Sequence, residues 1–174
     1  MGPVGFFDRL TGTKYPDSGV PPLASPEVRA ALLALNGAGN PYLVRNARPA
    51  EKADLVVDWR MPEPGAGSSY STRRREQSIK TRIRLDASRR EARAVDEWRK
   101  VVRVGNPPGL TVGREHGRGP VNMVYREWTY ERGPDGRRRR VEAFRFDSRE
   151  VKVPLQEAVL GAGWTWRGVV FGRL

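Results

Sequence analysis

The chain has 174 residues and a net charge of +12, from 32 basic and 20 acidic side chains. It contains no cysteine and one histidine, which excludes disulfides, thiolate metal sites, cysteine nucleophiles and zinc sites built from several Cys and His side chains. The length suits one domain, and neither a secretion signal nor a run of roughly 20 apolar residues is present, so we expect a cytoplasmic protein without integral membrane association.

The positive charge is unevenly distributed along the chain. Residues 1–72 hold seven basic and seven acidic side chains, so residues 73–174 carry the whole net charge of +12. Arginine supplies 27 of the 32 basic residues; a G+C-rich genome explains that choice of residue type but not the net charge. Such an asymmetry indicates either a polyanion partner or a solubilising surface.

The first part of the chain predicts an irregular arm followed by the start of a single domain. Residues 1–24 are interrupted by glycine and proline too often for regular structure, and the domain is expected to span residues 25–174. A helix is predicted from Ser25 as N-cap, with Pro26 at the first helical position, to a stop at Asn36-Gly37. Strands follow at residues 42–45 and 53–60, and a loop rich in Pro, Gly and Ser at residues 61–77.

From Ser78 onward the pattern is that of β-structure. Ile79, Thr81, Ile83 and Leu85 alternate with three basic residues, which predicts a strand with one apolar and one cationic face. Residues 86–90 form a turn, and residues 91–104 return as an antiparallel partner long enough to contain a bulge. Residues 105–120 are expected to be a loop rich in Gly and Pro.

The last part of the chain predicts a hairpin, a helix and a closing strand. The hairpin pairs residues 121–131 with residues 137–147 around a turn at residues 133–136. A short helix is expected at residues 154–162 with Pro154 at its start, and a strand at residues 164–171 with Trp164 and Trp166 on one face. The fold class is therefore α+β: a twisted, mainly antiparallel sheet of about six to eight strands, one N-terminal helix and one short C-terminal helix.

Three parts of the chain carry a further resemblance: residues 5–10 (GFFDRL), Arg84-Leu85-Asp86 followed by residues 93–96 (RAVD), and the tail from Pro154-Leu155-Gln156 through residues 162–168 (AGWTWRG). In these segments the chain resembles a family of short actinobacterial proteins of the Streptomyces type, a family of unknown function. These segments cover 28 of the 174 residues, about a sixth of the chain. The resemblance implies no catalytic or binding residues, and the arginine runs are not part of the family's pattern.

The main candidate site is a cationic surface for nucleic acid. Arginine suits phosphate because its planar guanidinium donates two parallel hydrogen bonds and is always charged. We expect basic side chains from separate stretches to gather on one sheet face that follows a phosphate backbone without reading sequence. The candidate residues are Arg73, Arg74, Arg75, Lys80, Arg82, Arg84, Arg137, Arg138, Arg139 and Arg140. Exposed aromatic residues beside them would add base stacking, the candidates being Tyr125, Trp128, Tyr130, Trp164 and Trp166.

The alternatives remain open at the level of the sequence. The arginines are also typical of the solvated face of a one-sided sheet, partly neutralised by nearby glutamates, in a structural or interaction domain whose charge only solubilises it. A basic sheet face could also meet an acidic protein partner. An anionic membrane surface ranks lower, because Phe6-Phe7 is the one apolar stretch suited to insertion. His116 lies in a predicted polar loop without a positioned partner, so we expect no catalysis, metal or cofactor. The oligomeric state is left open.

Overall fold

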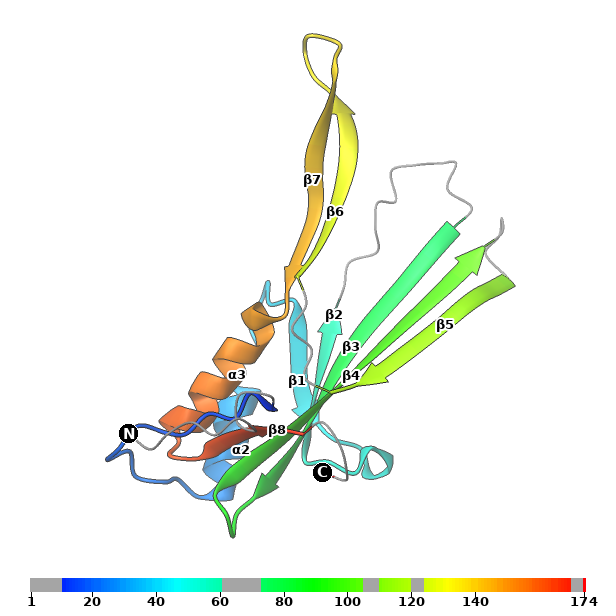
Figure 1. Ribbon diagram of the computed structural model, residues 1–174. Helices are drawn as coiled ribbons and strands as arrows, with labels where there is room; N and C mark the ends of the chain where they lie inside the picture. The colour runs from blue at the N-terminus through cyan, green and yellow to red at the C-terminus, as the bar shows by residue number, and fades with distance from the viewer. Residues whose placement is uncertain (1–10, 61–72, 105–109, 120–123, 170–173) are drawn as a thin grey trace.

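The computed structural model describes residues 11–60, 73–104, 110–119, 124–169 and 174 (Figure 1). Within these ranges it contains a six-stranded sheet in the order β1-β2-β3-β4-β5, with β8 beside β4, and a separate two-stranded sheet, β6-β7. All the pairs are antiparallel except β4 with β8. The predicted α+β class and mainly antiparallel sheet are confirmed. The strands are β1 (Tyr42–Asn46), β2 (Leu55–Arg60), β3 (Arg73–Asp86), β4 (Glu91–Val104), β5 (Leu110–Arg118), β6 (Val124–Arg132), β7 (Arg138–Asp147) and β8 (Thr165–Gly168).

Two helices, α2 (Ser25–Leu33) and α3 (Arg149–Gly161), cover one face of the six-stranded sheet (Figure 1). Helix α2 begins one residue earlier than predicted, because Ala24 and not Ser25 is the N-cap. The Glu27 carboxylate accepts a hydrogen bond from the Ala24 N–H at 2.8 Å, which satisfies a donor at the helix start. Val28 and Leu32 lie one turn apart on the helix and are fully buried.

The core lies between these helices and the alternating face of β3. Ile79 and Ile83 are buried on that face, as the alternation predicts, and pack with Leu155 of α3. Trp164, which directly precedes the short strand β8, and Trp166, within it, are both buried in the same cluster. The core therefore uses side chains from both ends of the chain, and it ties the C-terminal segment to the sheet.

One ion pair is buried in this core, on the side of the sheet that α3 covers. Lys152 of α3 extends its ammonium to 2.7 Å from a carboxylate oxygen of Asp96 on β4. The Thr81 hydroxyl donates to the other oxygen of that carboxylate at 2.7 Å. The Lys152 and Asp96 side chains are 13% and 5% exposed, so the pair is held away from most of the solvent. It connects α3 to β4 across the core.

The N-terminal arm pairs with the last strand of the sheet. The Lys14 N–H donates to the Trp166 carbonyl oxygen at 2.8 Å, and the Trp166 N–H donates to the Lys14 carbonyl oxygen at 2.9 Å. Residues 15–24 then run to α2 without a helix or strand. Phe6 and Phe7, the apolar stretch considered for a membrane surface, lie outside the described residues.

Two predicted loops are wrong where the structure describes them. Arg73–Gln77 belongs to β3, because its backbone pairs with residues 100–104 of β4 and so has its hydrogen bonds satisfied. Residues 110–118 form β5 along the other side of β4. Gly117 allows this pairing: its missing side chain leaves room for the Trp98 indole, which lies where a Cβ would stand.

The start of the C-terminal helix is also earlier than predicted. Helix α3 begins at Arg149, which places Pro154 inside the helix instead of at its start. A proline there lacks an N–H for the preceding turn. The first turn forms nevertheless, because Asp147 accepts a hydrogen bond from the Arg149 N–H at 3.0 Å and Val151 is fully buried. Strand β8 ends at Gly168, and part of the predicted segment, residues 170 and 171, lies outside the described residues.

Candidate nucleic-acid interface

The hairpin arm consists of β6, β7 and the five residues that join them, and it projects away from the two helices (Figure 1). This is the predicted hairpin. Its turn is closed by hydrogen bonds from the Gly133 N–H to the Arg137 carbonyl oxygen and from the Gly136 N–H to the Gly133 carbonyl oxygen, both at 2.9 Å. Gly136 has a φ of 73°, a left-handed conformation that glycine adopts at little cost.

The register of the arm places its arginines and two aromatic residues on one face. Trp128 lies opposite Glu142, and Tyr130 opposite Arg140. Directly paired residues share a face of an antiparallel ribbon, and so do alternate residues of one strand. We name this the Trp128 face; it carries Val124, Arg126, Trp128, Tyr130, Arg132, Arg138, Arg140, Glu142, Arg145 and Asp147. Five arginines, one glutamate and one aspartate give it a net charge of +3.

Two backbone features decide which arginines belong to this face. The five-residue turn pairs Arg132 with Arg138, which puts Arg138 and Arg140 on the face of Tyr130. A β-bulge follows between Glu127 and Trp128, where β7 contains one extra residue. Because a shift of one residue exchanges the two faces of a strand, the bulge brings Arg145 to the Trp128 face.

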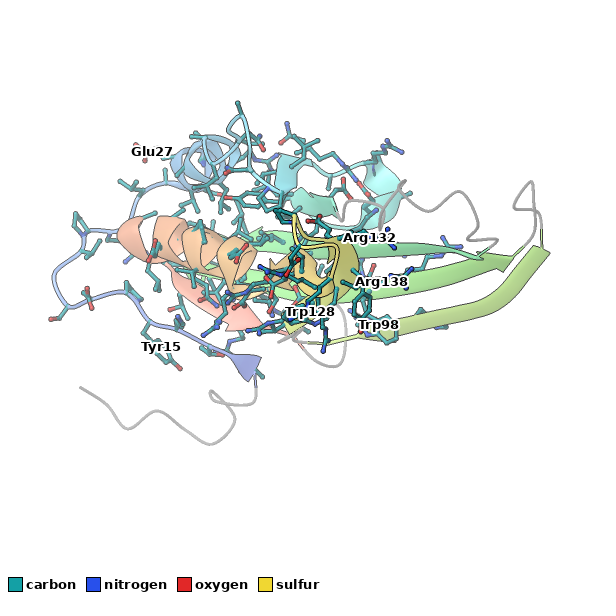
Figure 2. The ribbon with its side chains drawn as sticks, turned by 90° about the horizontal axis from the view of Figure 1, so that it is seen from above. Tyr15, Glu27, Trp98, Trp128, Arg132 and Arg138 are labelled. Carbon is teal, nitrogen blue, oxygen red and sulfur yellow. The ribbon has the colours of Figure 1, made fainter. Side chains whose placement is uncertain are left out.

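At the centre of the Trp128 face an arginine stacks on an aromatic ring. The guanidinium carbon of Arg140 lies 4.3 Å from the centre of the Trp128 ring, a cation–π contact. Trp128 is 40% exposed and Tyr130 is 69% exposed, so both rings remain accessible to solvent. Figure 2 looks along the arm from above and shows Trp128, Arg132 and Arg138 close together at the hairpin arm.

Most of the arginines on the Trp128 face have no carboxylate partner within the described part of the chain. Arg126 makes one long ion pair with Glu142, at 3.9 Å. Arg145 interacts electrostatically with the Asp147 carboxylate, and its charge helps to lower the pKa of that group. Arg132 and Arg138 are exposed, and no ion pair of either is found among the described residues. The face is therefore charged and open.

The opposite face of the arm differs in its charge pairing. Arg139 is the neighbour of Arg138 and Arg140 in the chain but belongs to the other face. There it forms an ion pair with Asp135 of the turn at 3.0 Å. The arginine run 137–140 is thus divided between two faces, and its residues are not equivalent.

On β3, two of the candidate basic side chains are engaged with carboxylates. The Lys80 ammonium lies 3.1 Å from Glu51 and 3.8 Å from Asp58. Arg82 forms an ion pair with Glu97 and donates to the Glu51 carbonyl oxygen at 2.9 Å. These contacts hold the short 3-10 turn η1 (Pro49–Glu51) against the sheet. Lys80 and Arg82 have a structural environment, as expected for the solvated, paired face of a sheet.

Glu51 is the centre of this ionic cluster. Arg45 donates to both of its carboxylate oxygens, at 2.7 and 2.8 Å, and a third hydrogen bond comes from the Arg48 N–H at 2.7 Å. The Arg45 guanidinium, followed by the Arg48 amide and Lys80, holds the pKa of Glu51 well below its ordinary value. The same hydrogen bond raises the pKa of Arg45. Glu51 and Arg45 therefore both stay ionised at neutral pH.

The remaining candidates are placed as follows. Arg84 donates to the backbone oxygen of Leu174 at 3.0 Å and to that of Lys52 at 3.4 Å. Arg73, Arg74 and Arg75 pair through their backbones with residues 102–104 of β4, and their side chains lie outside what the structure describes. In both views the start of β3 and the tip of the hairpin arm lie apart, so the backbones of the two arginine runs are not adjacent.

Among the aromatic candidates, the structure separates core from surface. Trp164 and Trp166 are 1% and 3% exposed and cannot stack on a base without unfolding the core. Trp128 and Tyr130 remain available, and the side chain of Tyr125 lies outside the described part. His116 is exposed opposite Arg99, but it lies on β5 and not in the predicted loop.

Three arginines of the Trp128 face were missed by the sequence analysis: Arg126, Arg132 and Arg145. The first two were detectable, because Arg126, Trp128, Tyr130 and Arg132 occupy alternate positions of one strand. Arg145 was not, because its face depends on the bulge.

Comparisons with known proteins add no assignment. No family model matches the chain, and no curated protein or solved structure is found to be similar to it. The resemblance to short actinobacterial proteins therefore stays a prediction. Among the described residues, no group of three acidic or histidine side chains is arranged to hold a metal ion, and neither helix is long and apolar enough to cross a membrane.

Proposed function

We propose that this protein binds nucleic acid through the Trp128 face of its hairpin arm, by contacts to phosphate that do not depend on base sequence. The observation that carries the proposal is the Arg140 guanidinium stacked on Trp128, on a face with a net charge of +3. The expected surface included basic residues of both β3 and the arm; the arm is favoured because Lys80 and Arg82 on β3 are paired with carboxylates.

The stacked arginine is suited to phosphate for a chemical reason. A guanidinium that lies on an aromatic ring keeps its N–H donors in its own plane, at the edge of the stack. Those donors then need no further ordering when a phosphate approaches, so less side-chain entropy is lost on binding. Arg132 and Arg138, a directly opposed pair at the end of β6 and the start of β7, extend the positive charge toward the tip.

The shape of the arm supports the same proposal. A two-stranded β-ribbon is narrow enough to enter the major groove of duplex DNA or to lie along a single strand. The arm is such a ribbon, and it stands clear of the helices (Figure 1). Five arginines on one face can neutralise up to about five phosphates, which predicts binding that weakens steeply with salt.

The alternative is a structural or protein-interaction domain whose charge only solubilises it or meets an acidic partner. The paired environments of Lys80 and Arg82 favour that interpretation for β3. For the arm, this alternative predicts that DNA binding depends only on the total charge and not on which face carries it. The two functions are therefore distinguished by whether binding depends on the face of the arm or on its total charge.

The experiment compares two double variants of equal net charge. Arg138→Gln with Arg140→Gln removes two charges from the Trp128 face. Arg137→Gln with Arg139→Gln also removes two charges, one from the turn (Arg137) and one from the opposite face of the arm (Arg139). Binding of labelled DNA is followed by fluorescence anisotropy through a salt titration. For the wild type we expect log affinity to fall linearly with log salt, with a slope of about −4 on duplex.

We expect the Arg138/Arg140 variant to lose about 2 units of that slope, and the Arg137/Arg139 variant to keep most of it. Both variants should melt close to the wild-type temperature, since exposed charges contribute little to folding. Equal losses in the two variants would indicate a dependence on total charge alone. The proposal fails if no DNA binds at low salt, or if binding does not change with salt.

A further inference from the structure

We infer that the ligand of the arm is single-stranded nucleic acid, with unstacked bases placed on Tyr130 and Trp128. This inference rests on the proposed function and names the class of its ligand. It comes from the two aromatic rings, not from the arginines. Tyr130 is 69% exposed and Trp128 is 40% exposed, on a surface that would be more soluble without either ring.

The spacing of the two rings favours separated bases. Trp128 and Tyr130 are alternate residues of one strand, so their backbones are about 6.8 Å apart, twice the rise per residue. That distance is about twice the 3.4 Å between stacked bases along one strand of a duplex. The two positions thus match bases that have been separated from their neighbours, not bases that remain stacked on each other.

A duplex offers these rings little to bind. Within a duplex the flat faces of the bases are covered by the adjacent base pairs, and only base edges are presented in the grooves. An unpaired strand exposes the flat faces, on which aromatic side chains and arginine stack. Tyr130 directly opposes Arg140, so a base on the tyrosine ring has a phosphate-binding group on the neighbouring strand.

An anionic lipid surface is the other ligand that arginine and aromatic residues suit. Attachment to lipid requires apolar side chains that enter the acyl region together. On the Trp128 face the two rings are instead interleaved with arginines, and Arg140 lies 4.3 Å from the centre of the tryptophan ring. Insertion would carry that guanidinium below the headgroups, which is costly. The arrangement favours a nucleic acid.

The test replaces the rings by side chains of different chemistry. Trp128→Leu with Tyr130→Leu keeps apolar character and removes the aromatic faces, whereas Trp128→Phe with Tyr130→Phe keeps an aromatic face at each position. Tyr15→Leu is the control, because Tyr15 is 53% exposed and lies away from the arm (Figure 2). Each protein is titrated with a labelled single strand of non-self-complementary sequence and with the duplex formed by annealing its complement. Circular dichroism verifies the fold.

We expect the leucine variant to lose about 25-fold or more in affinity for the single strand, since each stacked base contributes about 5- to 100-fold. Duplex affinity should fall by no more than about fivefold, from loss of the cation–π contact that orients Arg140. The phenylalanine and Tyr15 variants should bind the single strand within about threefold of the wild type.

The other outcomes overturn the inference in distinguishable ways. If the leucine variant binds both DNA forms as the wild type does, or loses both equally, while Arg138→Gln with Arg140→Gln still weakens them, the arm binds phosphate without stacking. The single-strand inference is then wrong and the proposed function stands. If neither form binds at low salt, the proposed function itself fails. If vesicles of phosphatidylserine and phosphatidylcholine bind instead, and the leucine variant binds them equally well, the surface is a lipid site.

Discussion

The buried ion pair between Lys152 and Asp96 gives a direct test of how α3 is held to the sheet. Lys152→Met replaces the ammonium by an apolar group of similar length and leaves the Asp96 carboxylate buried. The Thr81 hydroxyl still donates to it, but the positive charge at 2.7 Å is lost. Breaking a pair of this kind by removing one partner costs about 3–5 kcal/mol, because the remaining buried carboxylate loses the ammonium at 2.7 Å.

That loss is large compared with the stability of a domain, about 5–15 kcal/mol. For a chain of this length, each kcal/mol lowers the melting temperature by about 2–4 °C, so we expect a decrease of about 6–20 °C. The measurement is urea denaturation followed by circular dichroism, with thermal melting as a second probe. The double variant Asp96→Asn with Lys152→Met removes both charges and should recover a substantial part of the loss.

The control is the same substitution at Lys14, which is exposed. Lys14→Met should change the free energy of unfolding by no more than about 0.5 kcal/mol. If Lys152→Met stays within about 1 kcal/mol of the wild type, the pair does not hold the helix to the sheet. A double variant less stable than Lys152→Met alone would show that Asp96 contributes through other contacts.

Two further predictions concern packing and pH. Gly117→Ala should cost about 1–3 kcal/mol in unfolding free energy, because the new Cβ would overlap the Trp98 indole. Gly161→Ala is the control: its Cβ meets open space at the end of α3, so the variant should be neutral or more stable by up to about 1 kcal/mol. Equal effects of the two substitutions in urea denaturation would refute the packing of Trp98 against Gly117. The pKa of Glu51 is lowered in the folded state by Arg45, so the stability it contributes is complete above about pH 4.3 and is lost as the pH falls below that value. Glu51→Gln should therefore be less stable than the wild type at pH 7, and the difference in melting temperature should narrow between pH 4 and pH 2. A difference that stays constant with pH would contradict a lowered pKa of Glu51 in the folded protein.

Local patterns were sufficient to predict much of the architecture. The alternation from Ile79 to Leu85 correctly predicted which face of β3 is buried, because a strand presents alternate residues to opposite sides whatever lies beyond it. The first helix and the hairpin were predicted within a few residues from capping and turn residues, which act over short distances along the chain. β5 was missed because its pairing depends on the Trp98 indole covering Gly117, a contact between different strands.

The candidate site shows the same division. The sequence by itself determined that arginines are concentrated after residue 72. It also determined that Arg126, Trp128, Tyr130 and Arg132 occupy every second position of one strand. Only the tertiary structure decided which of the basic groups remain available. Lys80 meets Glu51 across 29 positions of the chain, and residue type does not reveal a partner so distant. The length of one turn and a single bulged residue then set the faces of the arm, because each added residue turns every following side chain to the other side.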